Sequence, residues 1–122
     1  MTLEQYIDSI GKRYKLGNAT EHSFRGDLQQ LIESLVPEIK ATNEPKRQQC
    51  GAPDYIITRK GIPLGYIEAK DIGADLGSKN YKEQFDRYKQ SLDNLIITDY
   101  LTFQLFREGT KVTTISIGLV QG

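Results

Sequence analysis

Apolar residues recur every three or four positions in three stretches of the chain, and this spacing predicts three amphipathic helices. The first spans residues 3–15, and the second runs from an N-cap at Thr20 to about Val36, just before Pro37. The third spans residues 80–92. Its inward stripe consists of Tyr81, Gln84, Phe85, Tyr88 and Leu92. Each helix then has one face that can pack on another element.

Alternating apolar and polar residues predict a β-hairpin in the middle of the chain. Residues 54–58 and 64–70 flank the turn-like sequence Arg59-Lys60-Gly61, and a short strand around residues 39–42 precedes them. Residues 71–79 are expected to form a loop that leads into the third helix.

Three apolar segments follow the third helix, at residues 95–98, 101–107 and 112–119. The last two alternate and are joined by Glu108-Gly109, which predicts a second hairpin. Helices and strands in this order are typical of an α/β fold, in which helices pack on the faces of a mixed sheet. A chain of 122 residues is expected to form one domain with its own core.

Composition and charge narrow the function classes. Lys and Arg number 16 and Asp and Glu number 16, so the net charge is near zero, which argues against a protein that holds nucleic acid by bulk charge. Nucleic acid stays open as a substrate, because local clusters can still bind phosphates. No apolar run approaches the ~20 residues of a membrane span. We therefore expect no membrane partner. The single cysteine, Cys50, cannot form an internal disulfide, so we expect a cytoplasmic location, where the environment is reducing.

The polar residues with the clearest chemistry lie in the first hairpin. Pro53-Asp54 is followed, after thirteen residues, by Glu68-Ala69-Lys70. Side chains alternate along a strand, so Glu68 and Lys70 project from the same side. If the hairpin closes through a three-residue loop at residues 60–62, Asp54 lies opposite Glu68, with ~4.5–5.5 Å between their Cβ atoms. A slip by one residue would move Glu68 to the other face.

Two carboxylates at this distance can share a divalent cation. Carboxylate oxygens hold Mg²⁺ with open water positions, and the metal both acidifies its bound water and draws charge from a phosphodiester. A lysine beside them can position or deprotonate the attacking water and offset the negative charge that develops. Asp54, Glu68 and Lys70 therefore suggest phosphodiester hydrolysis.

Each of these residues also has a simpler interpretation. The Asp54…Glu68-X-Lys70 spacing alone is common, and a Glu–Lys pair on one strand face is often a solvated edge. The surrounding residues 65–69 favour a site, because they otherwise have the pattern of a buried strand. Glu21, at the start of the second helix, is either a site residue or an acidic residue favoured by the helix dipole. Gln84 and Tyr88 lie four residues apart and face the same centre, and ordinary core packing is the alternative for Tyr88.

Taken together, these residues resemble the PD-(D/E)XK nuclease superfamily. The set is Pro53-Asp54…Glu68-Ala69-Lys70, with Glu21 upstream and Gln84-X₃-Tyr88 downstream, as in RecB/Mrr-like branches. Four segments further resemble the N-terminal nuclease domain of large single-chain restriction–modification enzymes of type IIG and type ISP. They are residues 21–25, 41–47, 51–55 and 65–71. The resemblance covers about residues 20–107 and implies a restriction-endonuclease-like mixed β-sheet flanked by helices.

The resemblance also implies a role for each residue. Asp54 and Glu68 ligate Mg²⁺, for which Mn²⁺ can substitute, and the Ala69 carbonyl is an extra ligand. Lys70 serves the attacking water. Glu21 orients or ligates from the helix side. Gln84 and Tyr88 contact the DNA backbone or brace the active-site strand.

Residues 1–122 would then be a single nuclease domain, with an N-terminal helix and link at 1–19 and an αβββαβ-type catalytic core at 20–119. Methyltransferase and target-recognition domains do not fit in this length, so we expect them on a longer parent polypeptide. The expected substrate is double-stranded DNA, cut on both strands when two copies meet transiently. The alternatives are a non-catalytic DNA-binding relic of the fold, a DNA repair or junction nuclease, and an interaction domain with an incidental charged hairpin.

Overall fold

The computed structural model describes residues 1–16, 21–43 and 51–118 of the chain. Within them, three helices and six strands follow one another along the sequence. They are α1 (Leu3–Leu16), α2 (Glu21–Leu35), β1 (Ile39–Asn43), β2 (Tyr55–Arg59), β3 (Ile62–Ala69), α3 (Lys79–Ser91), β4 (Asn94–Thr98), β5 (Thr102–Arg107) and β6 (Thr110–Ser116). The predicted helices and strands are therefore present, with bounds that differ by a few residues. The predicted N-cap at Thr20 lies outside the described residues.

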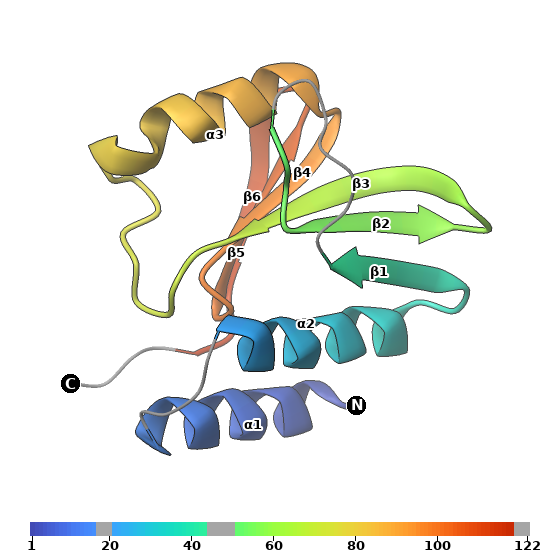
Figure 1. Cartoon of the computed structure of the whole chain (residues 1–122), viewed down its shortest axis with the longest axis vertical. Helices are drawn as coiled ribbons and strands as arrows, with labels where there is room; N and C mark the ends of the chain where they lie inside the picture. Colours follow the sequence, from blue (N-terminus) through green and yellow to red (C-terminus); the bar gives the residue numbers. More distant parts are fainter. Residues whose placement is uncertain (17–20, 44–50, 119–122) are drawn as a thin grey trace.

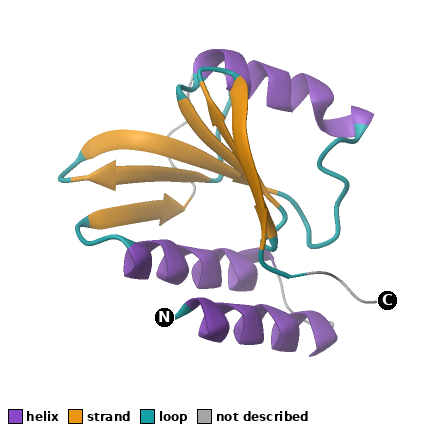
Figure 2. Ribbon diagram, turned by 180° about the vertical axis from the view of Figure 1, so that it is seen from behind, coloured by secondary structure: helices purple, strands orange, loops and turns teal. Residues whose placement is uncertain are grey.

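The six strands form one mixed sheet in the order β1-β2-β3-β4-β5-β6. Neighbouring strands are antiparallel except β3 and β4, which are parallel and are connected through α3. Helices α1 and α2 lie on one side of the sheet and α3 on the other (Figures 1 and 2). This confirms the predicted α/β architecture, a mixed sheet with helices on both faces. No helix in the described part of the chain is long and apolar enough to cross a membrane.

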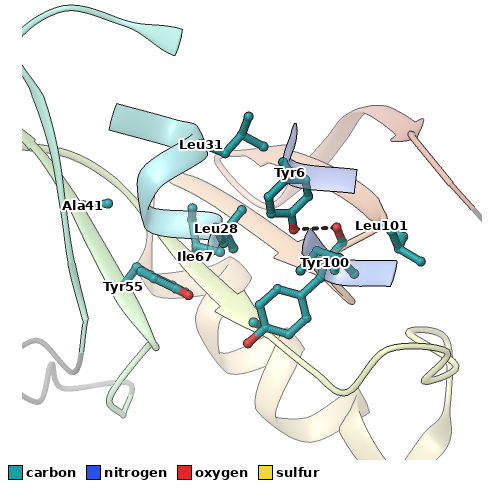
Figure 3. Close-up of a cluster of buried hydrophobic side chains, with 10 residues drawn as sticks. Tyr6, Leu28, Leu31, Ala41, Tyr55, Ile67, Tyr100 and Leu101 are labelled. Atoms are coloured by element: carbon teal, nitrogen blue, oxygen red, sulfur yellow. Dashed lines mark hydrogen bonds between the residues drawn. The ribbon is translucent and has the colours of Figure 1, made fainter. Parts of the chain in front are cut away.

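Two separate hydrophobic cores fill the two faces of the sheet. The core beneath α1 and α2 consists of Tyr6, Ile10, Leu28, Leu31, Ala41, Tyr55, Ile67, Ala69, Tyr100 and Leu101 (Figure 3). The core beneath α3 consists of Phe85, Tyr88, Leu92, Leu95, Ile97 and Phe106, with Tyr66 packed against it. Because side chains alternate along β3, Ile67 and Ala69 face the first core, and Glu68 faces α3 together with Tyr66.

The β2–β3 hairpin corrects one detail of the prediction. Its loop has two residues, Lys60 and Gly61, with φ of 51° and 80°, as a type I′ turn requires. Arg59 therefore pairs with Ile62, and the predicted pairing of residues 59 and 63 is wrong. A register shift between Ile57 and Thr58 adds the extra residue on β3, and beyond it Tyr55 pairs with Ile67. Asp54 and Glu68, the next residues along, consequently lie opposite each other as predicted.

Candidate functional site

Asp54 and Glu68 each bind the main chain of the opposite arm at the open end of the β2–β3 hairpin. The backbone N–H of Asp54 donates to Glu68 Oε1 at 3.3 Å, and the backbone N–H of Ala69 donates to Asp54 Oδ2 at 2.8 Å. The structure thus brings together the two acids that the register argument placed opposite each other, at the end of the hairpin nearest α3.

Lys70 connects these acids to α3. Its ammonium donates to Glu68 Oε2 at 3.2 Å and to Gln84 Oε1 at 2.7 Å. The Gln84 amide nitrogen in turn donates to the Tyr88 hydroxyl at 3.4 Å. Glu68, Lys70, Gln84 and Tyr88 therefore form a chain of hydrogen bonds from the strand to the helix. The amide of Gln84 has polar partners beneath the helix, as its inward position requires.

The β3–α3–β4 connection explains why α3 covers the acids. Parallel strands need a crossover, and here the crossover helix packs on the sheet face that carries Glu68. The backbone N–H of Lys70 donates to the Thr98 carbonyl at 2.8 Å, which extends the β3–β4 ladder past the end of β3. This hydrogen bond keeps the backbone of Lys70 in the sheet, on which α3 packs. Gln84 and Tyr88, four residues apart, present the same side of α3 to it.

Gly51 allows the chain to approach Tyr88 just before Pro53-Asp54. Its φ is 129°, and a Cβ at this position would lie 3.1 Å from Tyr88 Cε1 and 3.2 Å from the Tyr88 hydroxyl. A side chain here would be strained and would push against the ring. Tyr88 is also a buried member of the core beneath α3. The ring of Tyr88 therefore packs in the core, while its hydroxyl accepts the hydrogen bond from Gln84.

Asp54, Glu68, Lys70, Gln84 and Tyr88 form a polar cluster, and Arg25 also belongs to it. The sequence assigned no role to Arg25. Its Nη2 donates to Asp54 Oδ1 at 2.7 Å, and both side chains are largely buried, with 12% and 15% exposed. The Tyr55 hydroxyl donates to the Arg25 carbonyl at 2.8 Å, so the start of β2 is bound to α2 in two places. The available signal was the position of Arg25 in the segment 21–25, four residues after Glu21 and thus on the same helix face.

Tyr81 is a second residue whose contact with the cluster was not predicted. The Lys70 ammonium lies 4.9 Å from the centre of the Tyr81 ring and 5.7 Å from that of Phe85. Such contacts contribute ~0.5–1 kcal/mol each at exposed sites. On the sequence, Tyr81 is one aromatic residue in an apolar stripe, which does not distinguish a cation partner from a core residue.

The Glu21 side chain lies outside what the structure describes, although its backbone begins α2. Whether it belongs to the cluster or acts only on the helix dipole stays a prediction. The polar connection at residues 44–50 also lies outside the described residues.

The cluster contains two acids, and their electrostatics are unusual. The pKa of Glu68 is raised to about 7, chiefly by burial and then by the negative charge of Asp54, while Lys70 acts in the opposite direction. Glu68 is only 4% exposed. Within the described part of the chain, the positive charges that touch the acids are the Arg25 guanidinium on Asp54 and the Lys70 ammonium on Glu68. A buried pair of like charges of this kind is stabilised by a cation placed between its oxygens.

The donor atoms fit a hard cation such as Mg²⁺. Asp54 and Glu68 offer carboxylate oxygens and Ala69 a backbone carbonyl, which are the ligand types that Mg²⁺ takes alongside several waters. Counting the described residues, each of the four carboxylate oxygens accepts one hydrogen bond, and a carboxylate oxygen can interact with more than one partner. Among the described residues no third His, Cys, Asp or Glu joins the pair in a metal-holding group. The site is therefore a two-carboxylate site within that part of the chain.

A similar fold occurs in a solved structure described as the cryo-EM structure of the DrdV–DNA complex. The match has a TM-score of 0.69 and covers 93% of this chain, at 23% sequence identity. The fold is restriction-endonuclease-like. At this identity the likeness shows the fold alone, and this chain spans only 12% of the length of the matched one. No protein-family model and no curated protein sequence matches the chain.

Proposed function

We propose that this restriction-endonuclease-like chain is a Mg²⁺-dependent DNA endonuclease domain, the cleavage module of a restriction–modification enzyme. The observation that carries the proposal is the pair of crossed hydrogen bonds between Asp54 and Glu68 with Lys70 bound to one of them. The fold likeness to a chain found in complex with DNA supports DNA as the substrate.

Asp54, Glu68 and the Ala69 carbonyl would hold the Mg²⁺ ion, and Mn²⁺ would be accepted by the same oxygen donors. When bound, the metal would lower the pKa of a water and draw charge from the phosphate oxygens. The protein's own contribution is to hold two carboxylates together in a largely buried position, where electrostatic interactions are stronger than in water. An incidental charged hairpin does not require this arrangement, since it would leave its acids solvated.

Lys70 is proposed to orient the attacking water and to offset charge on the phosphate. Its ammonium has three donors, and Glu68 and Gln84 accept two of them in the structure. The third is available for a water or a phosphate oxygen. Gln84 and Tyr88 would keep the ammonium directed at that position, whereas the family resemblance implies that they contact the DNA backbone or brace the active-site strand.

DNA affinity and sequence choice are proposed to reside outside these residues. The net charge is zero, so bulk charge supplies little attraction for DNA. Methyltransferase and target-recognition domains on the same polypeptide would supply the binding energy, and a second copy would cut the other strand.

The test is duplex cleavage by the chain in Mg²⁺, with EDTA and Lys70→Ala as controls. We expect nicking that requires Mg²⁺ and falls by ~10²–10⁴ in Lys70→Ala, the range typical of a lost proton-transfer or charge-stabilising group. Mg²⁺ titration followed by NMR gives a second measurement, with shifts centred on Asp54 and Glu68. Undiminished cleavage by Lys70→Ala, or Mg²⁺ shifts elsewhere in the chain, would contradict the proposal.

A further inference from the structure

Arg25 lies where a metal ion would compete with it. Its guanidinium binds Asp54 Oδ1 at 2.7 Å, and Asp54 is one of the two acids proposed to hold Mg²⁺. A dication and a guanidinium that approach the same carboxylate repel each other, and the pair is largely buried, so solvent screens that repulsion incompletely. The position of Arg25 therefore bears on how tightly the metal can bind.

We propose that Arg25 competes with Mg²⁺ for Asp54, so that Mg²⁺ binds weakly to the chain alone and tightly once a DNA phosphate takes up the guanidinium. This rests on the proposed function and adds a regulation of the same site. Arg25 is thus a positioning residue that keeps Asp54 in place before substrate arrives.

The charge balance supports this competition. With both acids ionised, Asp54 and Glu68 carry two negative charges, and Arg25 and Lys70 carry two positive charges. Among the described residues these charges cancel, so an added dication leaves an excess of positive charge beside the two largely buried acids. A DNA phosphate adds a negative charge and offsets part of that excess. Metal and phosphate are therefore expected to favour each other's binding, and by linkage the coupling is the same in both directions.

The local geometry allows the guanidinium to change partners while α2 stays in place. The Tyr55 hydroxyl holds the backbone carbonyl of Arg25, and Tyr55 is fully buried. The backbone at this position is therefore fixed independently of the salt bridge. The planar guanidinium suits phosphate as well as carboxylate, so a phosphate is a chemically matched second partner.

The experiment is calorimetric titration of Mg²⁺ into the folded chain at pH 8, where Glu68, with its pKa of about 7, is mostly ionised. The proteins are wild type, Arg25→Gln, Arg25→Lys, Glu68→Gln and the Arg25→Gln/Glu68→Gln double variant. Without DNA, we expect Arg25→Gln to bind Mg²⁺ about tenfold more tightly, because the charged hydrogen bond from Arg25 to Asp54 no longer competes. Arg25→Lys keeps a positive charge that repels the metal, so its Mg²⁺ affinity should stay within about twofold of wild type.

A second series measures the coupling to DNA. It repeats the titration with a short duplex, in proteins that all carry Lys70→Met so that the DNA stays intact. In the Lys70→Met protein that keeps Arg25, the duplex is expected to tighten Mg²⁺ binding by about tenfold or more. In the Lys70→Met protein that also carries Arg25→Gln, most of this gain is expected to be lost. Structural damage from the substitution would weaken Mg²⁺ binding, so tightening without DNA is a signature that a merely structural role does not produce.

The outcomes separate this inference from the proposed function. If Arg25→Gln binds Mg²⁺ no more tightly than wild type while Glu68→Gln abolishes binding, the inference is wrong and the metal site stands. If both Glu68→Gln variants bind as tightly as their parents, the metal site itself is wrong. If wild-type binding is too weak to measure, measurable Mg²⁺ binding by Arg25→Gln supports the inference. If neither wild type nor Arg25→Gln binds Mg²⁺, both the inference and the metal site are wrong.

Thermal unfolding checks that each variant is folded. Arg25→Met, which keeps the aliphatic part of the side chain, replaces Arg25→Gln if that variant fails to fold.

Discussion

The two hairpins of the sheet are built alike and carry different side chains at their open ends. The β2–β3 hairpin turns at Lys60-Gly61 and the β5–β6 hairpin at Glu108-Gly109, and both residues of each turn have positive φ. Each hairpin also has one register shift at the same distance from its turn, between Ile57 and Thr58 and between Leu105 and Phe106.

Counted from the turns, Thr102 and Ser116 occupy the positions that Asp54 and Glu68 occupy in the first hairpin. The two hydroxyl groups lie 3.0 Å apart and are hydrogen-bonded at the sheet's β6 edge. The acid pair instead lies beneath α3, with Arg25 of α2 against it. The same backbone thus presents a solvated hydroxyl pair in one place and a buried acid pair in the other.

The difference shows that the hairpin alone does not produce the site. The hairpin determines which two residues face each other. The helices that cover them determine how deeply the two side chains are buried, and therefore how unfavourable their ionisation is. Under α3, burial raises the pKa of Glu68, which means that the ionised site opposes folding when no cation is bound. An acid pair kept in such a position is typical of sites that bind a ligand rather than of sites that stabilise a fold.

The largest expected difference between the hairpins is in DNA cleavage. Asp54→Asn keeps the size of the side chain and removes its charge, so we expect Mg²⁺-dependent cleavage to fall by ~10²-fold or more. Thr102→Asn, at the equivalent position two strands away from β3, is expected to change the rate by less than about twofold. Gel assays of duplex cleavage measure both. Equal losses in the two variants would mean that the acid pair has no special role.

The next difference is in the pH dependence of stability without metal. The pKa of Glu68 is about 7 in the folded protein against an ordinary value of 4.5, so between these pH values the folded chain binds a proton that the unfolded chain has lost. The stabilisation that the protonated Glu68 contributes to the folded state is therefore complete below pH 4.5. It declines as the pH rises and is lost above about pH 7. A shift of this size corresponds to about 3 kcal/mol in the free energy of unfolding. Urea unfolding from pH 4.5 to 8 measures it.

Two variants test whether Glu68 causes that slope. Glu68→Gln is expected to flatten it and to be more stable than wild type at high pH when no metal is present. Ser116→Glu places a carboxylate at the equivalent, exposed position of the other hairpin, where solvent keeps the pKa near its ordinary value, so it should add no slope. If wild type and Glu68→Gln lose stability in parallel, some other group controls the pH dependence.

The sequence predicted the acid pair because its geometry is local. Alternation along the strands and a glycine-containing turn were sufficient to place Asp54 opposite Glu68. The predicted three-residue loop was wrong, and the pairing was still correct, because the extra residue in the bulge on β3 compensates for the residue that the two-residue turn lacks. The elements and the α3 stripe were predicted for the same reason, since each follows from a periodicity within one segment.

The contacts that complete the cluster depend on how the helices dock. Arg25 meets Asp54 only because α2 packs beside the start of β2, and no spacing within one segment reports that approach. Tyr81 had the pattern of a core residue, and its contact with Lys70 follows from the crossover that places α3 over β3. Sequence periodicity thus predicts which residues share a face, whereas the packing of separate elements decides what each of them touches.

The smallest expected difference concerns two lysines that lie over aromatic rings. Lys70 Nζ is 4.9 Å from the centre of the Tyr81 ring, and Lys89 Nζ is 4.4 Å from that of Phe106 in β5. The first ammonium is also bound to Glu68 and Gln84, so loss of its ring is expected to slow cleavage about two- to fivefold in Tyr81→Leu. Lys89→Gln should leave the rate unchanged. Tyr81→Phe keeps the ring and should cleave like wild type; if it is as slow as Tyr81→Leu, the hydroxyl rather than the ring face is what Tyr81 contributes.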